Sequence, residues 1–426
     1  MKFNSKLIHA GWDSDENSEG SITVPIYRTT AYQFNNTEHA ANLFGLKEFG
    51  NIYSRLGNPT VGALEARLTA LEEGAMCVAL ASGTSAVMYS LINIMSQGDN
   101  FVTANQLYGG TYTMFDNILP EYGINSKKVD ITDLEAVEAA IDEKTRAIYC
   151  ETITNPGLVV ADISALADIA HSKGIPLIVD ATFTTSAILK PFEYGADIVV
   201  YSLTKWMSGH GRVIAGAVIE KGGFDWGNGN FPLYDKPDTS YGGMRWGHDL
   251  GDLGNVAYSL RLRTVPLRNL GANMSPDTAF EVMSGLETLA LRMERHCENA
   301  IKAAEYLTEH DLVEWVRFPG LKDDPAYDLS EKYLKGTGGT MVVFGIKGGK
   351  DGGQKFIDNL KMFRHVANVG DTRSLAIHPA TTTHSQLDED QLIAAGSPPE
   401  LIRLSIGIED IDDIIEDLSQ ALESTK

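Results

Sequence analysis

The chain has 426 residues, of which 43% are hydrophobic, 8% aromatic and 22% charged. That length and composition are typical of a globular protein with two domains, or with one domain and a large appendage. With 35 Lys and Arg against 57 Asp and Glu, the formal net charge is -22. A surface of this sign repels phosphate backbones and anionic lipids, so we expect neither nucleic acid nor a membrane surface as a partner.

The cysteines indicate a reducing compartment. Cys77, Cys150 and Cys297 are widely separated and odd in number, without any CxxC spacing. This pattern supports neither a zinc knuckle nor a disulfide framework, so we predict a cytoplasmic protein. Residues 1–20 lack the apolar stretch of a signal peptide. The longest apolar runs are also far below the ~20 residues of a membrane span.

The first part of the chain predicts an arm followed by an α/β domain. Residues 1–62 are rich in polar and turn-forming residues and show no sustained periodicity. An amphipathic helix is predicted over 64–74, and buried strands then alternate with helices. This alternation predicts a large domain over 63–272 with a mainly parallel sheet. The predicted strands cover 77–82, 100–104, 146–151, 176–181, 197–202 and 213–220.

The second part of the chain predicts a smaller domain after an insert. Residues 221–254 are rich in glycine and aromatic residues and predict a long ordered loop, which in a compact domain is often functional. Residues 273–426 predict a smaller α+β domain. A ligand is expected at the carboxyl ends of the parallel strands, near this second domain. The elements predicted there are helices over 278–310 and near 354–363, strands over 340–346 and 402–408, and a final amphipathic helix.

Lys205 stands out among the candidate functional residues. It follows directly on a predicted buried strand, in YSLTKWMSGHG (201–211), beside Ser202, Thr204 and Ser208. Most lysines in such turns are ordinary surface residues. A lysine at the carboxyl end of a strand, next to small hydroxyl residues, suits a Schiff base beside a phosphate site, as in a pyridoxal-phosphate enzyme.

A rival interpretation comes from Tyr201 and Lys205, which form the YxxxK spacing of short-chain dehydrogenases. Those enzymes also need a glycine-rich dinucleotide loop after their first strand. Here the first predicted strand is followed by SGTSA, which holds a single glycine. We therefore interpret the YxxxK match as chance.

Two further segments fit a pyridoxal-phosphate site. Asp180 ends a predicted buried strand in PLIVDAT. An Asp there can simply cap the next helix, but such a cofactor needs an Asp beside its pyridine nitrogen to keep that nitrogen protonated. Ser82, Gly83 and Thr84 open a helix, whose amides and dipole can hold a phosphate. Helix starts of this kind are common, so the second signal is weak alone.

Other residues keep two interpretations. Tyr108, in LYGGTY, either stacks on an aromatic ring or lines the core. Arg403 lies on a predicted buried strand, where an unpaired charge is costly, so it needs an anionic partner. That partner is either an internal carboxylate or a substrate carboxylate, since the guanidinium fork suits both. The ten histidines lack metal-ligand spacing, and we interpret His378 and His384 as structural.

Together these motifs resemble the Cys/Met-metabolism family of pyridoxal-phosphate enzymes over essentially the whole chain. Within that family the chain most resembles the O-acetylhomoserine sulfhydrylases, through the insert that follows Gly222, SGLETLALRMERH (284–296) and the segment 365–387. The family landmarks are YSRLGNPT (53–60), LASGTSA (80–86), LYGGTY (107–112), ETITNP (151–156), VDATF (179–183), YSLTKWMSGHG (201–211) and IRLSIGIED (402–410).

The resemblance implies a type I aminotransferase-like fold and a homotetramer built as a dimer of dimers. It implies that Lys205 forms the Schiff base and carries protons, and that Asp180 faces the pyridinium. It also implies that Tyr108 stacks on the ring and that Asn155 lies near the ring hydroxyl. The remaining implied contacts are Gly83, Thr84, Ser202 and Thr204 to the phosphate, Tyr53 and Arg55 to the phosphate of a neighbouring subunit, and Arg403 with Asn368 to the substrate carboxylate.

The chain also departs from the family pattern. Ala181 stands where Asn is expected, Thr154 replaces an expected Gly, and Arg28, Thr84 and Arg212 also differ. The cofactor set is intact, so these differences bear on the substrate and the sulfur donor. The stretch Tyr-Gly-Gly-Thr (108–111) lacks the cysteine of the methionine γ-lyases, which argues against that branch.

We therefore predict γ-replacement in methionine biosynthesis. O-acetyl-L-homoserine and a sulfur nucleophile give L-homocysteine and acetate, with Tyr108 and Tyr53 as candidates for acid–base assistance. The donor is free sulfide, a thiol or a protein-borne sulfur. One alternative is a cystathionine γ-synthase or γ-lyase of the same family. Another is an idle cofactor-binding scaffold, which would need none of Lys205, Asp180 and Arg403.

Overall fold

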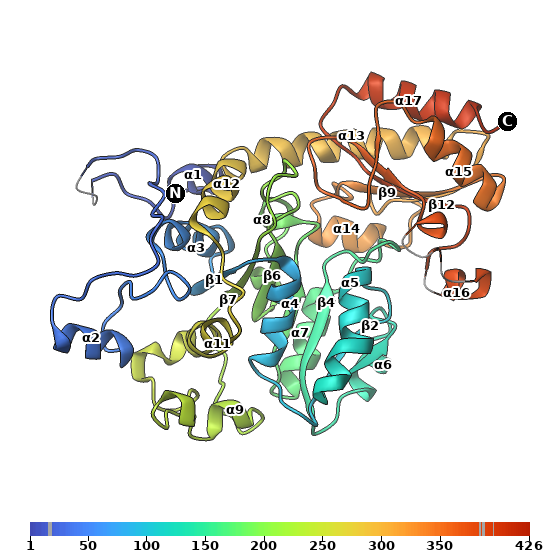
Figure 1. Cartoon of the computed structure of the whole chain (residues 1–426). Coiled ribbons are helices and arrows are strands. Elements are labelled where there is room, and N and C mark those ends of the chain that lie inside the picture. Colours follow the sequence, from blue (N-terminus) through green and yellow to red (C-terminus); the bar gives the residue numbers. More distant parts are fainter. Residues whose placement is uncertain (16–18, 383–384, 386–387, 395) are drawn as a thin grey trace.

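The structure is a computed structural model that describes residues 1–15, 19–382, 385, 388–394 and 396–426. Within these residues the chain forms two sheets, which lie side by side in Figure 1. The larger sheet has the strand order β1-β7-β6-β5-β4-β2-β3. Its strands are β1 (Met76–Leu80), β2 (Asn100–Ala104), β3 (Asn125–Val129), β4 (Thr145–Glu151), β5 (Leu177–Asp180), β6 (Ile198–Ser202) and β7 (Gly216–Glu220).

The larger sheet is mainly parallel, as predicted. The neighbouring strands from β3 to β6 are all paired in parallel, whereas β7 runs antiparallel to both β6 and β1. Three of its strands, β2, β4 and β7, are buried along their whole length, because helices cover the sheet. The parallel strands therefore present their carboxyl ends at one edge, where loops that carry functional residues can meet.

The smaller sheet has the strand order β10-β11-β12-β9-β8. Apolar residues of this sheet and of the helices packed on it form a separate buried cluster that includes Phe344, Phe356 and Leu418. In Figure 1 the long helix α13 (Leu289–Thr308) runs from the region of the larger sheet to the smaller one. The strands are β8 (Val313–Arg317), β9 (Met341–Ile346), β10 (Arg364–His365), β11 (Leu375–Ile377) and β12 (Leu401–Ser405).

The helices start where the sequence offers caps. The helix predicted over 64–74 begins earlier, because the side chain of Asn58 accepts the Thr60 N–H and Pro59 fits the first helical turn. The predicted border at residue 62 therefore falls inside this helix, and the division into arm, large domain and small domain stays a prediction. The helices are α1 (Phe3–His9), α2 (Thr37–Phe44), α3 (Pro59–Glu72), α4 (Gly83–Ile92), α5 (Gly109–Thr113), α6 (Leu134–Ala139), α7 (Ile163–Ser172), α8 (Thr185–Ile188), α9 (Pro232–Asp235), α10 (Ala257–Leu262), α11 (Arg268–Leu270), α12 (Pro276–Leu286), α14 (Tyr327–Tyr333), α15 (Gly349–Asn359), α16 (Glu389–Ala394) and α17 (Ile411–Glu423).

The insert over 221–254 is an ordered segment, as its composition predicts. It holds α9 and short 3-10 turns, and its aromatic side chains are buried against the larger sheet's core. Trp226 stacks on Tyr234 with ring centroids 5.0 Å apart, and Asn93 donates a hydrogen bond to the Tyr234 hydroxyl. None of the helices formed by described residues is long and apolar enough to cross a membrane.

Candidate active site

Lys205 lies in the turn that follows β6, at the carboxyl edge of the larger sheet. Its Nζ donates a 2.6 Å hydrogen bond to Oδ1 of Asn368. Burial, and secondly the positive charge of Arg403, lower the pKa of Lys205 to about 8. Among the described residues no carboxylate forms an ion pair with this amine. At pH 7 about a tenth of the side chain is therefore the neutral, nucleophilic amine, far more than for an ordinary lysine.

Arg403 connects Lys205 to two loops of the site. Its Nη1 donates to Oδ1 of Asn155 at 3.0 Å, and its Nη2 donates to the backbone oxygen of Asn368 at 3.3 Å. Burial lowers the pKa of Arg403 to about 10. Within the described part of the chain no carboxylate pairs with it. The prediction of an anionic partner thus finds no internal candidate, and the guanidinium remains available for an external carboxylate.

Asp180 ends β5, the strand next to β6. Its Oδ1 accepts the Thr182 N–H at 2.9 Å, and its Oδ2 accepts the Tyr149 hydroxyl at 3.4 Å. Burial raises the pKa of this carboxyl, while the Thr182 hydrogen bonds oppose that rise. The chain therefore places an acid beside the lysine turn, where a protonated ring nitrogen would stabilise its charged form.

The start of α4 forms an anion cradle. Ser82 caps the helix by accepting the Ser85 N–H, which leaves the amides of Gly83 and Thr84 ahead of the helical ladder. A Cβ on Gly83 would lie 2.5 Å from the Cβ of Ser202, so the helix start can approach β6 only because this residue is glycine. Helix start and strand end therefore enclose a space suited to a phosphate.

Thr204 is engaged elsewhere in this cradle. Its hydroxyl donates to the Ala215 oxygen at 3.2 Å and accepts the Ala215 N–H at 2.9 Å. A phosphate contact from Thr204 would require the hydroxyl proton to turn away from Ala215. The phosphate role of Thr204 therefore stays a prediction, as do the roles of Ser202 and Thr84.

Tyr108 stands at the start of α5, with 50% of the residue exposed. Its backbone N–H donates to Oε1 of Glu151 at 2.8 Å. A Cβ on Gly110 would lie 2.6 Å from the Tyr108 ring, so this glycine lets the ring fold over the turn. Arg403 lies near enough for the Tyr108 hydroxyl to affect its pKa. The ring is thus beside the site and outside the core.

The two arm residues lie apart from this group. Tyr53 and Arg55 are both exposed, and the Arg55 guanidinium lies 5.1 Å from the centroid of the Tyr53 ring. No hydrogen bond or ion pair joins either side chain to the other predicted site residues in the described part of the chain. Their assignment to a neighbouring subunit's site stays a prediction.

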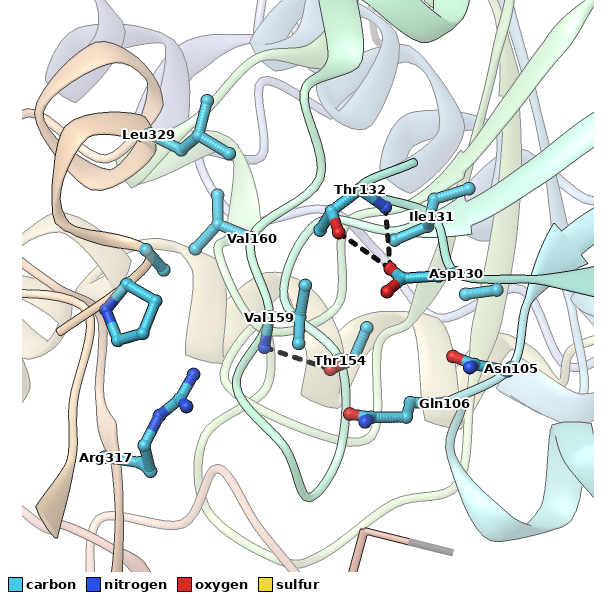
Figure 2. A pocket seen from close by; sticks show the side chains of 13 residues that line it. Asn105, Gln106, Asp130, Ile131, Thr132, Thr154, Val159, Val160, Arg317 and Leu329 are labelled. Atoms are coloured by element: carbon cyan, nitrogen blue, oxygen red, sulfur yellow. Dashed lines mark hydrogen bonds between the residues drawn. The ribbon is translucent and has the colours of Figure 1, made fainter. Parts of the chain in front are cut away.

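Thr154, one of the departures, lines a cavity next to the site. Figure 2 shows this cavity, of about 230 Å³, bordered by the ends of β2 and β3, the loop after β4 and Arg317. The Thr154 hydroxyl accepts the Val159 N–H at 3.0 Å, and the Thr154 N–H donates to the Val159 oxygen. Thr154 therefore closes the loop that carries Asn155.

The other departures lie in different surroundings. Arg28 forms an exposed ion pair with Asp277, and Arg212 lies 3.7 Å from Glu281. Exposed pairs of this kind contribute little to stability. Ala181 is fully buried directly after Asp180.

Tyr201 and His378 both have internal partners. The Tyr201 hydroxyl is fully buried and donates to Glu72, so it does not face Lys205 as a dehydrogenase tyrosine would. His378 is buried and bonded to the Pro399 oxygen at 2.7 Å, which confirms its structural role. His384 lies outside the described residues. No cluster of acidic, His or Cys side chains able to hold a metal ion exists among the residues described.

Glu151 is the residue that the sequence analysis missed. It ends β4, pairs in register with Asp180, and holds the backbone of Tyr108. The sequence offers a signal, because Glu151 ends a predicted buried strand four residues before Asn155. An acid at the buried end of a central strand needs partners, just as Asp180 does.

This arrangement fits pyridoxal phosphate on structural grounds. Lys205 offers a partly buried amine of lowered pKa, as the cofactor's aldehyde requires. Asp180, at the neighbouring strand end, offers an acid for the ring nitrogen, and the start of α4, with no room for a Cβ, offers amides for the phosphate. The fold, with its mainly parallel seven-stranded sheet and separate smaller sheet, is that of the type I pyridoxal-phosphate enzymes.

Comparisons with known proteins agree with this class. A family model described as Cys/Met metabolism PLP-dependent enzyme matches residues 4–423. The chain is 47% identical over 430 residues to O-acetyl-L-homoserine sulfhydrylase from Leptospira meyeri, which covers 100% of this chain and 97% of the relative. It is 46% identical to O-acetyl-L-homoserine sulfhydrylase 1 from Thermus thermophilus, over 99% of this chain and 100% of the relative.

A solved structure from Campylobacter jejuni is also similar. It is described as a candidate O-acetylhomoserine (thiol)-lyase with N'-pyridoxyl-lysine-5'-monophosphate at position 205 of that chain. It superimposes with a TM-score of 0.95 at 40% identity, covering 99% of this chain and 100% of that chain. The chain described here therefore belongs to the Cys/Met metabolism PLP-dependent enzymes. The predictions of family, fold and cofactor are confirmed.

Proposed function

We propose that this enzyme carries out γ-replacement on O-acetyl-L-homoserine, with a sulfur nucleophile giving L-homocysteine and acetate. The observation that carries the proposal is the contact chain Lys205–Asn368–Arg403–Asn155, in which a nucleophilic amine lies beside a guanidinium that has no carboxylate partner among the described residues. The relatives named O-acetyl-L-homoserine sulfhydrylase, at 47% and 46% identity over nearly full length, support the choice of substrate.

Arg403 binds the α-carboxylate of the amino-acid substrate. Its fork geometry allows two parallel hydrogen bonds to a carboxylate, and its position on β12 fixes the direction of that carboxylate. Asn155 and Asn368 hold the guanidinium through their oxygens, so it is oriented before substrate arrives. The substrate's α-carbon is thereby directed toward Lys205.

Lys205 carries protons during the reaction. When bound, pyridoxal phosphate supplies the electron sink that makes the substrate's α- and β-protons acidic. With a pKa of about 8, the Lys205 amine can both accept and return a proton near neutral pH. Removal of the α-proton and then a β-proton allows acetate to leave from the γ-carbon, where sulfur adds. Tyr108 and Tyr53 assist this acid–base chemistry.

The proposal also covers the oligomeric state of the enzyme, its compartment and its sulfur donor. The enzyme is a homotetramer in which Tyr53 and Arg55 of each arm complete the phosphate site of another copy. It works in the cytoplasm in methionine biosynthesis. Free sulfide is the simplest donor, and a thiol and a sulfur-carrying protein are the alternatives.

The test is a product assay on the purified enzyme. The enzyme, loaded with pyridoxal phosphate, is given O-acetyl-L-homoserine with sulfide, with a thiol or with cysteine, and the products are identified by mass spectrometry. Homocysteine formed only with sulfide, and absent with Lys205→Ala, is the expected result. Release of 2-oxobutyrate without sulfide would indicate a γ-lyase, and cystathionine formed from cysteine would indicate a cystathionine γ-synthase.

A further inference from the structure

Glu151 lies next to Asp180 at the carboxyl edge of the larger sheet. It is the last residue of β4, and its Cα pairs with that of Asp180 on the parallel strand β5. Residues paired in register on neighbouring parallel strands project to the same face of the sheet. The Glu151 residue is only 7% exposed. Two carboxyl groups therefore end adjacent strands on one side of the sheet.

The Glu151 carboxyl reaches the loops that carry two other site residues. Its Oε1 accepts the backbone N–H of Tyr108 at 2.8 Å. The backbone N–H of Asn155 also faces this carboxyl and favours its charged form. One side chain thus contacts the segment that presents Tyr108 and the segment that presents Asn155, while its own strand neighbour is Asp180.

The contact with Tyr108 determines where the aromatic ring can lie. Tyr108 precedes the first residue of α5, so its N–H has no partner in the helical ladder and needs another acceptor. Gly110 leaves room for the ring to fold over the turn, because a Cβ there would lie 2.6 Å from it. The bond to Glu151 thus holds the Tyr108 backbone at the end of β4, and the absent Cβ of Gly110 leaves room for the ring.

We propose that Glu151 is a positioning residue. Its side chain is long enough to bring an acceptor oxygen to the backbones of Tyr108 and Asn155, and this contact places both residues around the cofactor ring, beside Asp180. This inference rests on the proposed cofactor contacts of Tyr108, Asn155 and Asp180. Glu151 itself touches the backbone of the site and need not touch the cofactor.

The charge of Glu151 is not required for this role. Burial, and secondly the neighbouring Asp180, raise the pKa of Glu151 well above its usual range. Two carboxylates side by side, one buried and one partly buried, repel each other, which favours the protonated form of one of them. A neutral Glu151 leaves the negative charge on Asp180, where the ring nitrogen needs it, and its carbonyl oxygen still accepts the Tyr108 N–H.

Two substitutions of Glu151 separate the effect of its side-chain length from the effect of its charge. Glu151→Asp keeps the carboxyl but withdraws it by one methylene, about 1.5 Å. Glu151→Gln removes the acid but keeps the side-chain length and one acceptor oxygen. The matched control is Glu220→Asp, since Glu220 is another buried carboxyl at a strand end of the sheet and accepts the Ser259 N–H at 2.8 Å. For each variant we would measure melting temperature, the Kd of the apoenzyme for pyridoxal phosphate, and the visible circular dichroism of the bound cofactor.

Glu151→Asp should raise the cofactor Kd about tenfold and weaken the circular dichroism band, because the Tyr108 N–H loses its acceptor. Glu151→Gln should restore both to near the wild-type values. Glu220→Asp should lower the melting temperature without changing either cofactor signal. The proposal is overturned if Glu151→Asp changes the cofactor signals no more than Glu220→Asp does. It is equally overturned if Glu151→Gln loses as much as Glu151→Asp. All three measurements are made without substrate, so they remain decisive even if O-acetyl-L-homoserine is not turned over.

Discussion

Arg292 is buried and Arg403 is partly buried, and the partners of the two guanidinium groups differ. Burial lowers the pKa of each to about 10. Arg292 donates to the backbone oxygens of Trp206 and Gly285 at 2.7 Å, so its bonding is internal. Arg403 is bonded only to Asn155 and Asn368 among the described residues, and keeps capacity for a substrate carboxylate.

This difference predicts opposite effects of an Arg→Lys change. Arg403→Lys should keep the melting temperature and raise KM about ten- to hundredfold, because an ammonium cannot reproduce a bidentate fork worth roughly 1.5–3 kcal/mol. Arg292→Lys should lower the melting temperature and leave KM nearly unchanged. Steady-state kinetics and thermal melting on both variants check this. A destabilised Arg403→Lys with normal KM would contradict the anchor role.

The lowered pKa of Lys205 predicts how the rate of cofactor capture depends on pH. The neutral amine is the nucleophile, and its fraction rises with pH through the pKa. Burial and Arg403 lower that pKa from 10.5 to about 8. The rate at which apoenzyme captures pyridoxal phosphate should therefore rise with pH and level off above about 8. Arg403→Met removes a like charge and should move the midpoint upward. A wild-type midpoint near that of free lysine would contradict the assigned environment.

Substitution of Asp180 should slow exchange of the substrate α-proton and leave the fold intact. Asp180→Asn retains an oxygen that can accept the Thr182 N–H, so the end of β5 should stay intact. The negative charge that would hold the ring nitrogen's proton is lost, and exchange of the substrate α-proton should slow by roughly 10²–10³-fold. Exchange is measured by NMR in deuterated water. A matched control is Asp197→Asn, which removes a carboxylate bonded to His171 at the start of β6, away from the site. Unchanged exchange in Asp180→Asn would exclude this role.

At the scale of elements, the close approach of α4 and β6 makes Gly83 sensitive to substitution. A Cβ at this position would lie 2.5 Å from the Cβ of Ser202 and 2.9 Å from its Cα. Gly83→Ala should push the helix start outward and weaken binding of pyridoxal phosphate more than binding of unphosphorylated pyridoxal, because the phosphate cradle is what moves. Fluorescence titration of apoenzyme with both compounds measures this difference.

The control is Gly62→Ala in α3, where an added Cβ meets nothing within 4 Å. Alanine in a helix interior is favoured over glycine by roughly 0.5–1 kcal/mol, so Gly62→Ala should raise stability slightly and leave both affinities unchanged. Equal losses for phosphorylated and unphosphorylated cofactor in Gly83→Ala would contradict the phosphate cradle.

The elements that could be predicted from sequence are those with long buried runs. The strand over 100–104 was predicted with the bounds of β2, and the lysine turn was predicted because it follows the apolar strand β6. Strand β3 was missed, because its sequence NSKKV is polar and it lies at the edge of the sheet, where burial is partial. Strands β10 and β11 were missed because two or three residues carry no periodicity.

The site was predictable only in part for a related reason. Lys205 and Asp180 stand at the ends of apolar strands, so the hydrophobic pattern predicts that both lie at the carboxyl edge of the sheet. The contacts of Arg403 with Asn155 and Asn368 join segments far apart in the chain, which no local pattern encodes. Glu151 ends a predicted strand, but its partner is the backbone of Tyr108 and its neighbour is set by the register of two strands, so its role is visible only in the structure.

At the scale of the whole molecule, the arm exposes unusually apolar side chains. Ile22 is 88% exposed and Phe49 63%, and Ile214 beyond the lysine turn is 70% exposed. Eight of the sixteen large apolar side chains that are exposed in the described part of the chain lie in residues 1–62, and such a concentration is typical of surfaces that another protein covers. Tyr53 and Arg55 lie on the same arm, also exposed. These observations support the proposal that a second copy of the chain receives the arm.

A shared site predicts recovery of activity in hybrids. Arg55→Ala and Lys205→Ala should each be inactive alone. In a mixed dimer, the copy with an intact Lys205 receives the intact Arg55 from its partner, so one of its two sites is complete. Because random exchange makes half of the dimers mixed, about a quarter of wild-type activity should return. The two variants, carrying different tags, are mixed under conditions that exchange subunits, and native mass spectrometry verifies the hybrid.

The control mixes Lys205→Ala with the double variant Arg55→Ala/Lys205→Ala, in which every copy lacks the lysine and no activity should return. Verified hybrids without any recovery would show that each site is built from one chain alone.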